Sequence, residues 1–226
     1  MAHEGPLCLI VPGLDNSGPD HWQTLWEEKR DDCRRVDLGC WSEPDRRIWT
    51  ERLDAALAMT DGPLVLVAHS LGCLTIAWWA LGAPHERLAR VRGALLVAPP
   101  DVDAADAHPL VRRFAPAPAA ALPFPSILVA SRDDRYAAFD RLETLARAWG
   151  SRFVDAGHAG HINARVGARR LAGRRGAAGG TDRGECAVSD QSSGAPAERA
   201  CKVGFHLFSL CSIVEDGESN GQRSEL

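Results

Sequence analysis

The sequence lacks an excess of positive charge: its 226 residues carry 26 lysine and arginine side chains against 30 aspartate and glutamate side chains, for a net charge of −4. A protein that binds nucleic acid needs a basic surface, so we expect no nucleic-acid partner. The sequence also lacks an apolar run long enough to span a bilayer, and its N-terminus has no basic region followed by an apolar one. We therefore expect no membrane partner and a cytoplasmic location.

The cysteines form no recognisable framework. There are seven of them, an odd number, and their spacing matches neither a disulfide-rich domain nor a zinc site. We interpret them as free thiols in a reducing compartment, and we expect neither a metal nor another cofactor.

What the sequence does contain is an alternation of apolar, strand-like runs with segments of helical periodicity. Asp20 is available as the N-cap of the first helix. Strands that are apolar on both faces and separated by helices are typical of right-handed βαβ units in a covered parallel sheet. We therefore predict an α/β fold, a three-layer sandwich with a mainly parallel sheet of about six strands and helices on both faces. The expected strands lie within residues 6–13, 33–38, 62–70, 91–100, 124–134 and 151–157, and the expected helices within 19–32, 43–59, 71–83 and 136–150.

A serine stands at the junction of an expected strand and an expected helix, in the stretch AHSLG at residues 68–72. A nucleophilic serine needs a sharp strand-to-helix turn, and small residues two positions before and after it let that turn close. Ala68 and Gly72 are such residues around Ser70. The alternative interpretation is a tight turn with a buried serine.

The helix that begins at Leu71 offers free N–H groups and a positive dipole end to a developing oxyanion. The Leu71 N–H is therefore the expected first donor. A second donor usually comes from the loop after the first strand, where the Leu14 N–H is our prediction.

Candidate acids and bases follow later strands, in the order serine, acid, histidine that this kind of site requires. The stretch SRDDRY offers Asp133 and Asp134, and the stretch GHAGH offers His158 and His161. We favour Asp134, at the outer end of its loop, with Asp133 capping the loop or facing solvent. We favour His161 over His158 because Gly160 and the following residues indicate a tight loop.

Two further reactive side chains lie next to the serine. We interpret His69 as a residue that packs in the turn, because its position directs it away from the serine. We interpret Cys73 as a buried, inert thiol, since nothing near it in sequence would lower its pKa. The aspartate pair and the two histidines match no metal-binding motif, so no metal site is predicted.

Five segments together resemble the small serine hydrolases grouped with retinoblastoma-binding protein 9 and its bacterial relatives, within the α/β-hydrolase superfamily. The resemblance covers residue 6 to about residue 165. It implies a compact hydrolase without a large cap domain and a catalytic triad of Ser70, Asp134 and His161. The segments are IVPGLDNSGPDHWQTLWE, LVAHSLGCLTIAWWA, LLVAPPDVD, SRDDRY and GHIN.

The resemblance also implies that the segment GPDHWQ shapes the pocket beside the nucleophile. Asn16, His21 and Trp22 are the candidate pocket residues. For His21 and Trp22, packing at the start of the helix is an equally good interpretation.

The sequence changes character after about residue 165. All seven tryptophans precede this point, and the stretch that follows is rich in glycine, alanine and arginine. Such a stretch buries too little apolar surface to offset its ordering entropy. We predict a hydrolase domain over residues 1–165 and a largely disordered tail over residues 166–226. Within this tail, residues 204–214 are the one apolar, sticky segment, which we expect to associate with other apolar surfaces.

The tail also departs from the family. The bacterial relatives continue with a segment rich in serine and glycine and a last helix that packs on the sheet, whereas this chain continues VGARRLAGRRG. Codon degeneracy allows the expected segment in a reading frame shifted by one nucleotide. We therefore hypothesise a frameshifted tail and a domain that lacks its final helix.

These observations favour one function over two alternatives. The favoured function is hydrolysis of a small carboxylic ester, or of a small amide, with Ser70 as nucleophile, His161 as base and Asp134 as orienting acid. One alternative is a non-catalytic protein-binding module on a hydrolase scaffold, or a hydrolase inactivated by its altered C-terminus. The other is haloperoxidase-like or carbon–carbon bond chemistry on the same triad. The sequence itself gives no support for a protein partner.

Overall fold

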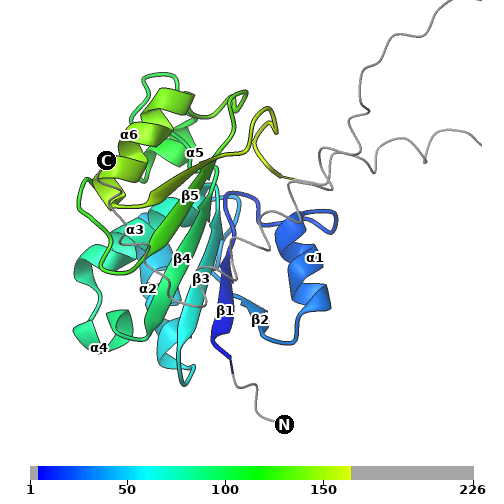
Figure 1. Ribbon diagram of the computed structural model, residues 1–226, viewed down its shortest axis with the longest axis vertical. Helices are drawn as coiled ribbons and strands as arrows, with labels where there is room; N and C mark the ends of the chain where they lie inside the picture. Colours follow the sequence, from blue (N-terminus) through cyan, green and yellow to red (C-terminus); the bar gives the residue numbers. More distant parts are fainter. Residues whose placement is uncertain (1–4, 164–226) are drawn as a thin grey trace, which may run out of the picture.

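The computed structural model describes residues 5–163, which form a six-stranded sheet in the order β2-β1-β3-β4-β5-β6 (Figure 1). All neighbouring strands run parallel, and no separate cap domain is inserted within the described residues. The predicted α/β fold is therefore confirmed. The strands are β1 (Leu7–Val11), β2 (Cys33–Arg35), β3 (Leu64–His69), β4 (Val91–Val97), β5 (Ser126–Ala130) and β6 (Arg152–Asp155); the helices are α1 (Trp22–Lys29), α2 (Arg46–Ala58), α3 (Leu71–Gly82), α4 (His85–Leu88), α5 (Pro109–Arg112) and α6 (Phe139–Trp149).

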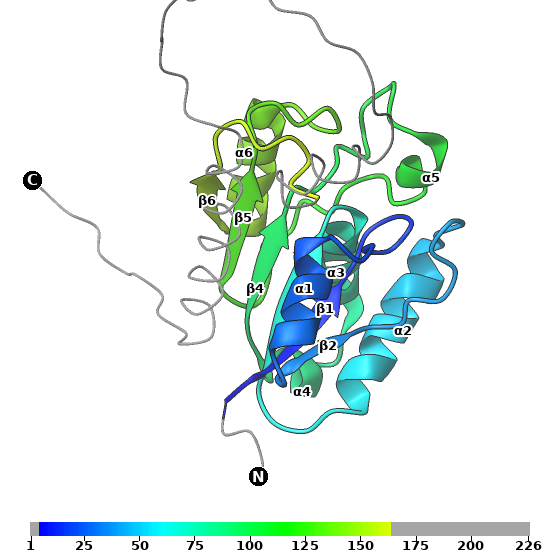
Figure 2. The same cartoon turned by 90° about the vertical axis from the view of Figure 1, so that its right-hand side faces the viewer.

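Helices cover both faces of the sheet, but unequally. Side chains of α2, α3 and α6 form one apolar cluster with alternate strand residues such as Leu66 and Leu96. The intervening strand residues, such as Val65 and Leu95, belong to a second cluster that includes side chains of α1. Side chains alternate between the two faces of a strand, so the clusters lie on opposite faces. Accordingly, α1 and α2 lie on opposite sides of β1 and β2 (Figure 2).

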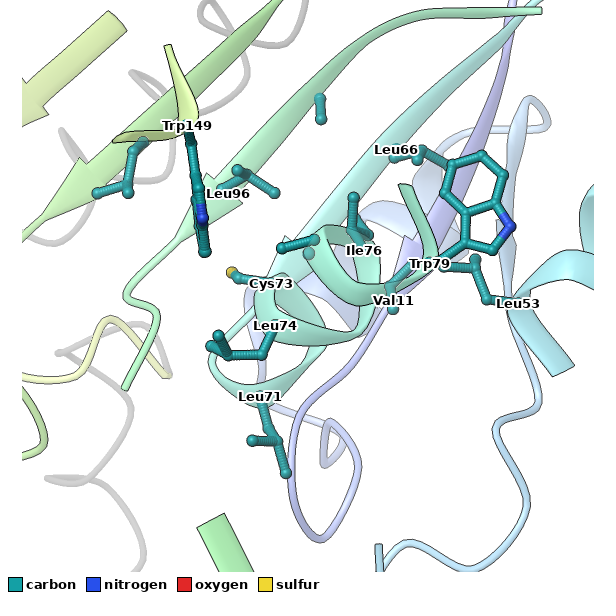
Figure 3. Close-up of a cluster of buried hydrophobic side chains, with 14 of the residues drawn as sticks. Val11, Leu53, Leu66, Leu71, Cys73, Leu74, Ile76, Trp79, Leu96 and Trp149 are labelled. Carbon is teal, nitrogen blue, oxygen red and sulfur yellow. The ribbon is translucent and has the colours of Figure 1, made fainter. Parts of the chain in front are cut away.

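The helix that follows the candidate nucleophile is the most deeply buried one. Nearly all side chains of α3 from Leu71 to Trp79 are buried, as expected for a helix that is apolar almost all round. In Figure 3, helix α3 lies between Leu96, a residue of β4, and Leu53, a residue of α2, which belong to the same apolar cluster. The start of α3 is consequently anchored in the core.

The first helix begins one residue later than predicted. His21, not Asp20, is the N-cap of α1, and its Nδ1 accepts a hydrogen bond of 3.2 Å from the Gln23 N–H. The prediction failed because the buried His21 ring supplies the acceptor that an aspartate normally provides, while Asp20 remains exposed.

The last predicted helix is also shorter at its start. We expected it from Tyr136, but α6 begins at Phe139. Before it, the Tyr136 N–H donates to Asp134 Oδ1 at 2.9 Å, so these residues form a turn around the carboxylate. The one-turn helices α4 and α5 were not predicted, because four residues are too few to show a helical period.

Within the part of the chain that the structure describes, no helix has both the length and the apolar character needed to cross a membrane. The predicted tail over residues 166–226, its sticky segment and the hypothesis of a missing final helix fall outside the described residues.

Candidate active site

Ser70 lies at a sharp turn between β3 and α3. Its φ of 53° and ψ of −125° are unusual for a residue with a side chain, and such conformations persist only where the surroundings impose them. Gly72 packs against the end of β1 so closely that a Cβ there would lie 2.2 Å from the Val11 carbonyl oxygen. A Cβ on Gly13 would lie 2.8 Å from the Cβ of Ser70. The turn thus depends on glycine in both contacting segments.

A chain of hydrogen bonds joins Ser70, His161 and Asp134. The Ser70 Oγ lies 2.9 Å from His161 Nε2, and His161 Nδ1 lies 2.8 Å from Asp134 Oδ2. The Asp134 side chain is fully buried and that of His161 is 10% exposed. Because Asp134 also accepts the Tyr136 N–H, both of its oxygens are held. This arrangement keeps the proton on Nδ1 and leaves Nε2 free to accept the proton of the serine hydroxyl.

The structure does not bring the alternative acid and base to Ser70. Asp133 is exposed and accepts the Ser131 hydroxyl at 2.7 Å and the Gly160 N–H at 2.8 Å, two bonds that lower the pKa of its carboxyl. His158 is an exposed residue of the same loop. Asp133 therefore fastens the loop that carries His161.

The two candidate oxyanion donors lie close to the serine. A Cβ on Gly13 would lie 3.2 Å from the Leu71 nitrogen, so the loop that carries Leu14 packs against the start of α3. Within the described part of the chain, neither the Leu71 N–H nor the Leu14 N–H donates to a hydrogen-bond acceptor. An oxyanion site requires N–H groups that have no such competing acceptor.

His69 makes a specific hydrogen bond in addition to the packing that we predicted for it. Its side chain lies on the same face of β3 as Val65, beneath α1, and only 4% of the residue is exposed. Its Nε2 lies 2.9 Å from the His161 carbonyl oxygen, so Nε2 carries the proton. Burial, followed by the nearby His21 and His161, keeps the pKa of His69 well below 6.5, so that the ring is neutral.

Cys73 is fully buried in the first turn of α3, and its thiol lies 3.5 Å from the Val97 carbonyl oxygen. Burial raises the pKa of this thiol, which keeps it protonated. The structure therefore gives Cys73 no nucleophilic character.

The candidate pocket residues have different surroundings. Asn16 Oδ1 accepts the Ser17 N–H at 2.7 Å and Arg35 at 3.0 Å, which fixes its loop. Trp22 is buried, and its Nε1–H donates to the Ile162 carbonyl oxygen at 2.9 Å. His21 is buried as well, and its ring lies 4.7 Å from the His69 ring.

The proton of His21 can be placed from its contacts. Burial first, and then the charges of Arg35 and His161, lower its pKa to about 3, so the ring is neutral. Because Nδ1 accepts the Gln23 N–H, the proton is on Nε2, which is buried without a hydrogen-bond partner in the described part of the chain.

Tyr136 and Ser131, two residues that contact the loop carrying His161, were not singled out from the sequence. The Tyr136 ring lies 4.4 Å from the His161 ring, and the residue is 38% exposed, so the imidazole has a partly exposed aromatic neighbour. The Ser131 hydroxyl accepts the Ala159 N–H at 2.9 Å. Both belong to the stretch SRDDRY, but no spacing rule assigns a role to either.

The chain is similar to known hydrolases in sequence and in fold. A family model described as "Serine hydrolase" matches residues 8–173. A solved structure of a YdeN-like hydrolase from Pectobacterium atrosepticum has a TM-score of 0.68 and 25% identity, covering 95% of this chain and 93% of that chain.

Two more distant structures share the fold. The ydeN gene product from B. subtilis has a TM-score of 0.55 and 20% identity, covering 70% of this chain and 88% of that chain. Est1E from Butyrivibrio proteoclasticus has a TM-score of 0.55 and 14% identity, covering 71% of this chain and 81% of that chain. A search of curated proteins gives no significant match.

Proposed function

The chain belongs to the serine hydrolase family, and from this premise we propose that it hydrolyses a small carboxylic ester through an acyl-enzyme formed on Ser70. The observation that carries this proposal is the unbroken hydrogen-bond chain from Ser70 Oγ through the His161 ring to the buried Asp134 carboxylate. Nucleophile, base and orienting acid within hydrogen-bond reach of one another are the arrangement that acyl transfer requires.

In the first half-reaction, Ser70 Oγ attacks the ester carbonyl carbon while His161 Nε2 accepts the hydroxyl proton. The carbonyl π electrons move to the oxygen, which becomes an oxyanion. When this intermediate collapses, the bond to the alcohol oxygen breaks, and His161 delivers its proton to the leaving alcohol. Throughout, the negative Asp134 stabilises the positive form of the imidazole.

In the second half-reaction, His161 removes a proton from water, whose oxygen attacks the acyl carbonyl. Collapse breaks the bond to Ser70 Oγ, which recovers a proton from His161, and the carboxylic acid is released. In both steps we assign oxyanion stabilisation to the N–H groups of Leu71 and Leu14. This assignment is supported by their lack of acceptors in the described part of the chain and by the packing of Gly13 on Ser70.

A small ester, rather than a macromolecule, is the proposed substrate. His21 and Trp22 are buried beside the His161 loop, and Asn16 fixes the loop that follows β1. Tyr136 lies beside His161 and is partly exposed, so we expect the substrate to enter on that side. All the groups that the reaction needs belong to this chain, so the proposed reaction uses no cofactor and no metal.

The test is turnover of a series of p-nitrophenyl esters of increasing acyl length, with the matching anilides, by the full-length protein. We expect ester hydrolysis, strongest for short chains, and a fall of at least about 1,000-fold for Ser70→Ala. Ser151→Ala, directly before the amino end of β6 and so at the opposite edge of the sheet from Ser70, is the matched control and should keep full activity. A well-folded protein without turnover would instead favour the protein-binding module.

A further inference from the structure

Two adjacent carbonyl groups of the His161 loop accept hydrogen bonds from buried side chains of other elements. His69, at the end of β3, donates its Nε2–H to the His161 carbonyl at 2.9 Å. Trp22, at the start of α1, donates its Nε1–H to the Ile162 carbonyl at 2.9 Å. The donors are 4% and 5% exposed, so water does not compete for these bonds.

The backbone at this point needs such support. Ile162 has a φ of 51°, a left-handed conformation that is a genuine outlier for a β-branched residue. A strained residue of this kind persists only when the surrounding structure imposes its conformation. The Ile162 side chain is buried in the same apolar cluster as Trp22, which adds packing to the hydrogen bond.

The other side of the loop is fastened separately. Ser131 accepts the Ala159 N–H and Asp133 accepts the Gly160 N–H, so the N–H groups that precede His161 are held from the β5 side. Among residues 5–163, the bonds from His69 and Trp22 are those that hold the carbonyl groups from the α1 side. Together the two sets fix the backbone on both sides of the base.

From these contacts we propose that His69 and Trp22 are positioning residues, which hold the His161 backbone so that its imidazole reaches Ser70 and Asp134 at the same time. The inference rests on the proposed function, because it concerns the placement of the proposed base. His69 directly precedes Ser70. Its hydrogen bond to the His161 carbonyl therefore connects the turn that carries the nucleophile to the loop that carries the base.

His69 suits this task because its ring remains neutral. A neutral imidazole with its proton on Nε2 donates to the carbonyl without placing a second positive charge beside His161. Its ring also contacts the His161 ring edge-on, with a centroid distance of 4.9 Å, and the His21 ring at 4.7 Å. A displacement of about 1 Å at a reacting group can lower a rate by about 100-fold, so small losses of this support should be measurable.

The experiment compares full-length variants that separate the hydrogen bond from packing. His69→Phe keeps a buried ring but removes the donor, whereas His69→Gln restores an N–H close to the position of Nε2. Trp22→Phe removes the second donor. Val65→Ala, on the same face of β3 but far from the loop, is the control for destabilisation alone.

Two readouts are recorded for each variant: kcat and KM on a p-nitrophenyl ester, and hydrogen exchange of the loop amides, above all that of Ile162, which donates to the Ala159 carbonyl. For His69→Phe we expect kcat to fall about 10- to 100-fold with KM changed less than about threefold, together with faster exchange of the Ile162 amide. Trp22→Phe should act in the same direction, and His69→Gln should recover most of kcat and of the amide protection.

Two results would overturn the inference. In the first, His69→Phe loses no more kcat per folded molecule than Val65→Ala and exchanges its loop amides no faster. In the second, His69→Gln is folded but as impaired as His69→Phe. If the wild-type protein hydrolyses no ester, the proposed function fails, and the exchange data still decide whether His69 and Trp22 hold the loop.

Discussion

The two faces of the sheet support the candidate active site in different ways. On the face covered by α2, α3 and α6, the core is almost entirely apolar, and it anchors the start of α3 behind Ser70 by packing. On the α1 face, polar side chains are buried at the catalytic end, among them His21, Gln23 and His69. Packing fixes the position of a helix, whereas the orientation of an imidazole requires directional hydrogen bonds. The comparison therefore separates residues that set stability from residues that set geometry.

The largest effect is expected where the hydrogen-bond chain itself is cut. Asp134→Asn should lower kcat by about 10,000-fold, because an amide holds the His161 ring in the wrong tautomer and cannot stabilise its charged form. The measurement is kcat on a p-nitrophenyl ester, corrected for the folded fraction. Asp133→Asn, one residue earlier, keeps an acceptor oxygen for the Ser131 hydroxyl and the Gly160 N–H, and it is the matched control. Equal losses in both variants would contradict the assignment of the acid.

The apolar face is tested by Leu74→Ala. This side chain is fully buried in α3, so its truncation should lower the free energy of unfolding by about 2–5 kcal/mol. Because Leu74 supports the site only through packing, kcat per folded molecule should stay close to wild type. Urea denaturation measures the first quantity, and activity at low temperature the second. A large loss of kcat in a fully folded sample would mean that the two faces are not separable in this way.

The α1 face should make stability depend on pH. The pKa of His21 falls from 6.5 when unfolded to about 3 when folded, and that of His69 also lies well below 6.5. The unfolded state therefore binds more protons below pH 6.5, and stability is lost as pH falls through this range. Between pH 7.5 and 5.5 His21 should remove roughly 1.4 kcal/mol, and His69 should act in the same direction. Denaturant titrations at these two pH values measure the loss.

Matched variants show where this pH dependence originates. His21→Asn keeps a side-chain acceptor at the N-cap of α1, and His69→Gln keeps a donor, but neither replacement titrates. Together they should flatten the profile between pH 7.5 and 5.5. The carboxyl groups of Asp133 and Asp155, whose pKa values are lowered, lose their contribution only below about pH 3.8 and stay outside this window. A profile that keeps its slope in the double variant would refute the explanation.

The smallest effect is expected at His158, which neighbours the base in sequence but is exposed. His158→Gln should change the free energy of unfolding by no more than about 0.5 kcal/mol. It should change kcat by no more than roughly twofold. Steady-state kinetics beside wild type provide the check. A loss comparable with that of His161→Gln would reverse the choice between the two histidines.

Much of the fold could be predicted because its signals are local. Strands such as β3 and β5 are short apolar runs, and the helices between them show periodic apolar residues, which is sufficient to predict a parallel sheet. Among the predicted helices, the errors were confined to the starts of two. His21 rather than Asp20 caps α1 because the His21 ring is buried by residues distant in sequence, which no local pattern reveals.

The candidate site was predictable only in part. Ser70, Asp134 and His161 could be chosen because each follows a strand, and the ends of parallel strands meet at one edge of the sheet. Their chemical roles stay predictions. The contacts of His69 and Trp22 join residues 92 and 140 positions apart, and no sequence pattern encodes such a pairing. These contacts depend on the three-dimensional arrangement of β3, α1 and the last described loop.

The most direct test of the central claim is covalent labelling of the full-length protein by a fluorophosphonate, with the modified residue mapped by mass spectrometry. A serine activated by His161 should react with one equivalent of the probe at Ser70. Ser70→Ala should take up none, and Asp134→Asn should react much more slowly. A folded protein that stays unlabelled, or a label that persists in Ser70→Ala, would contradict the account.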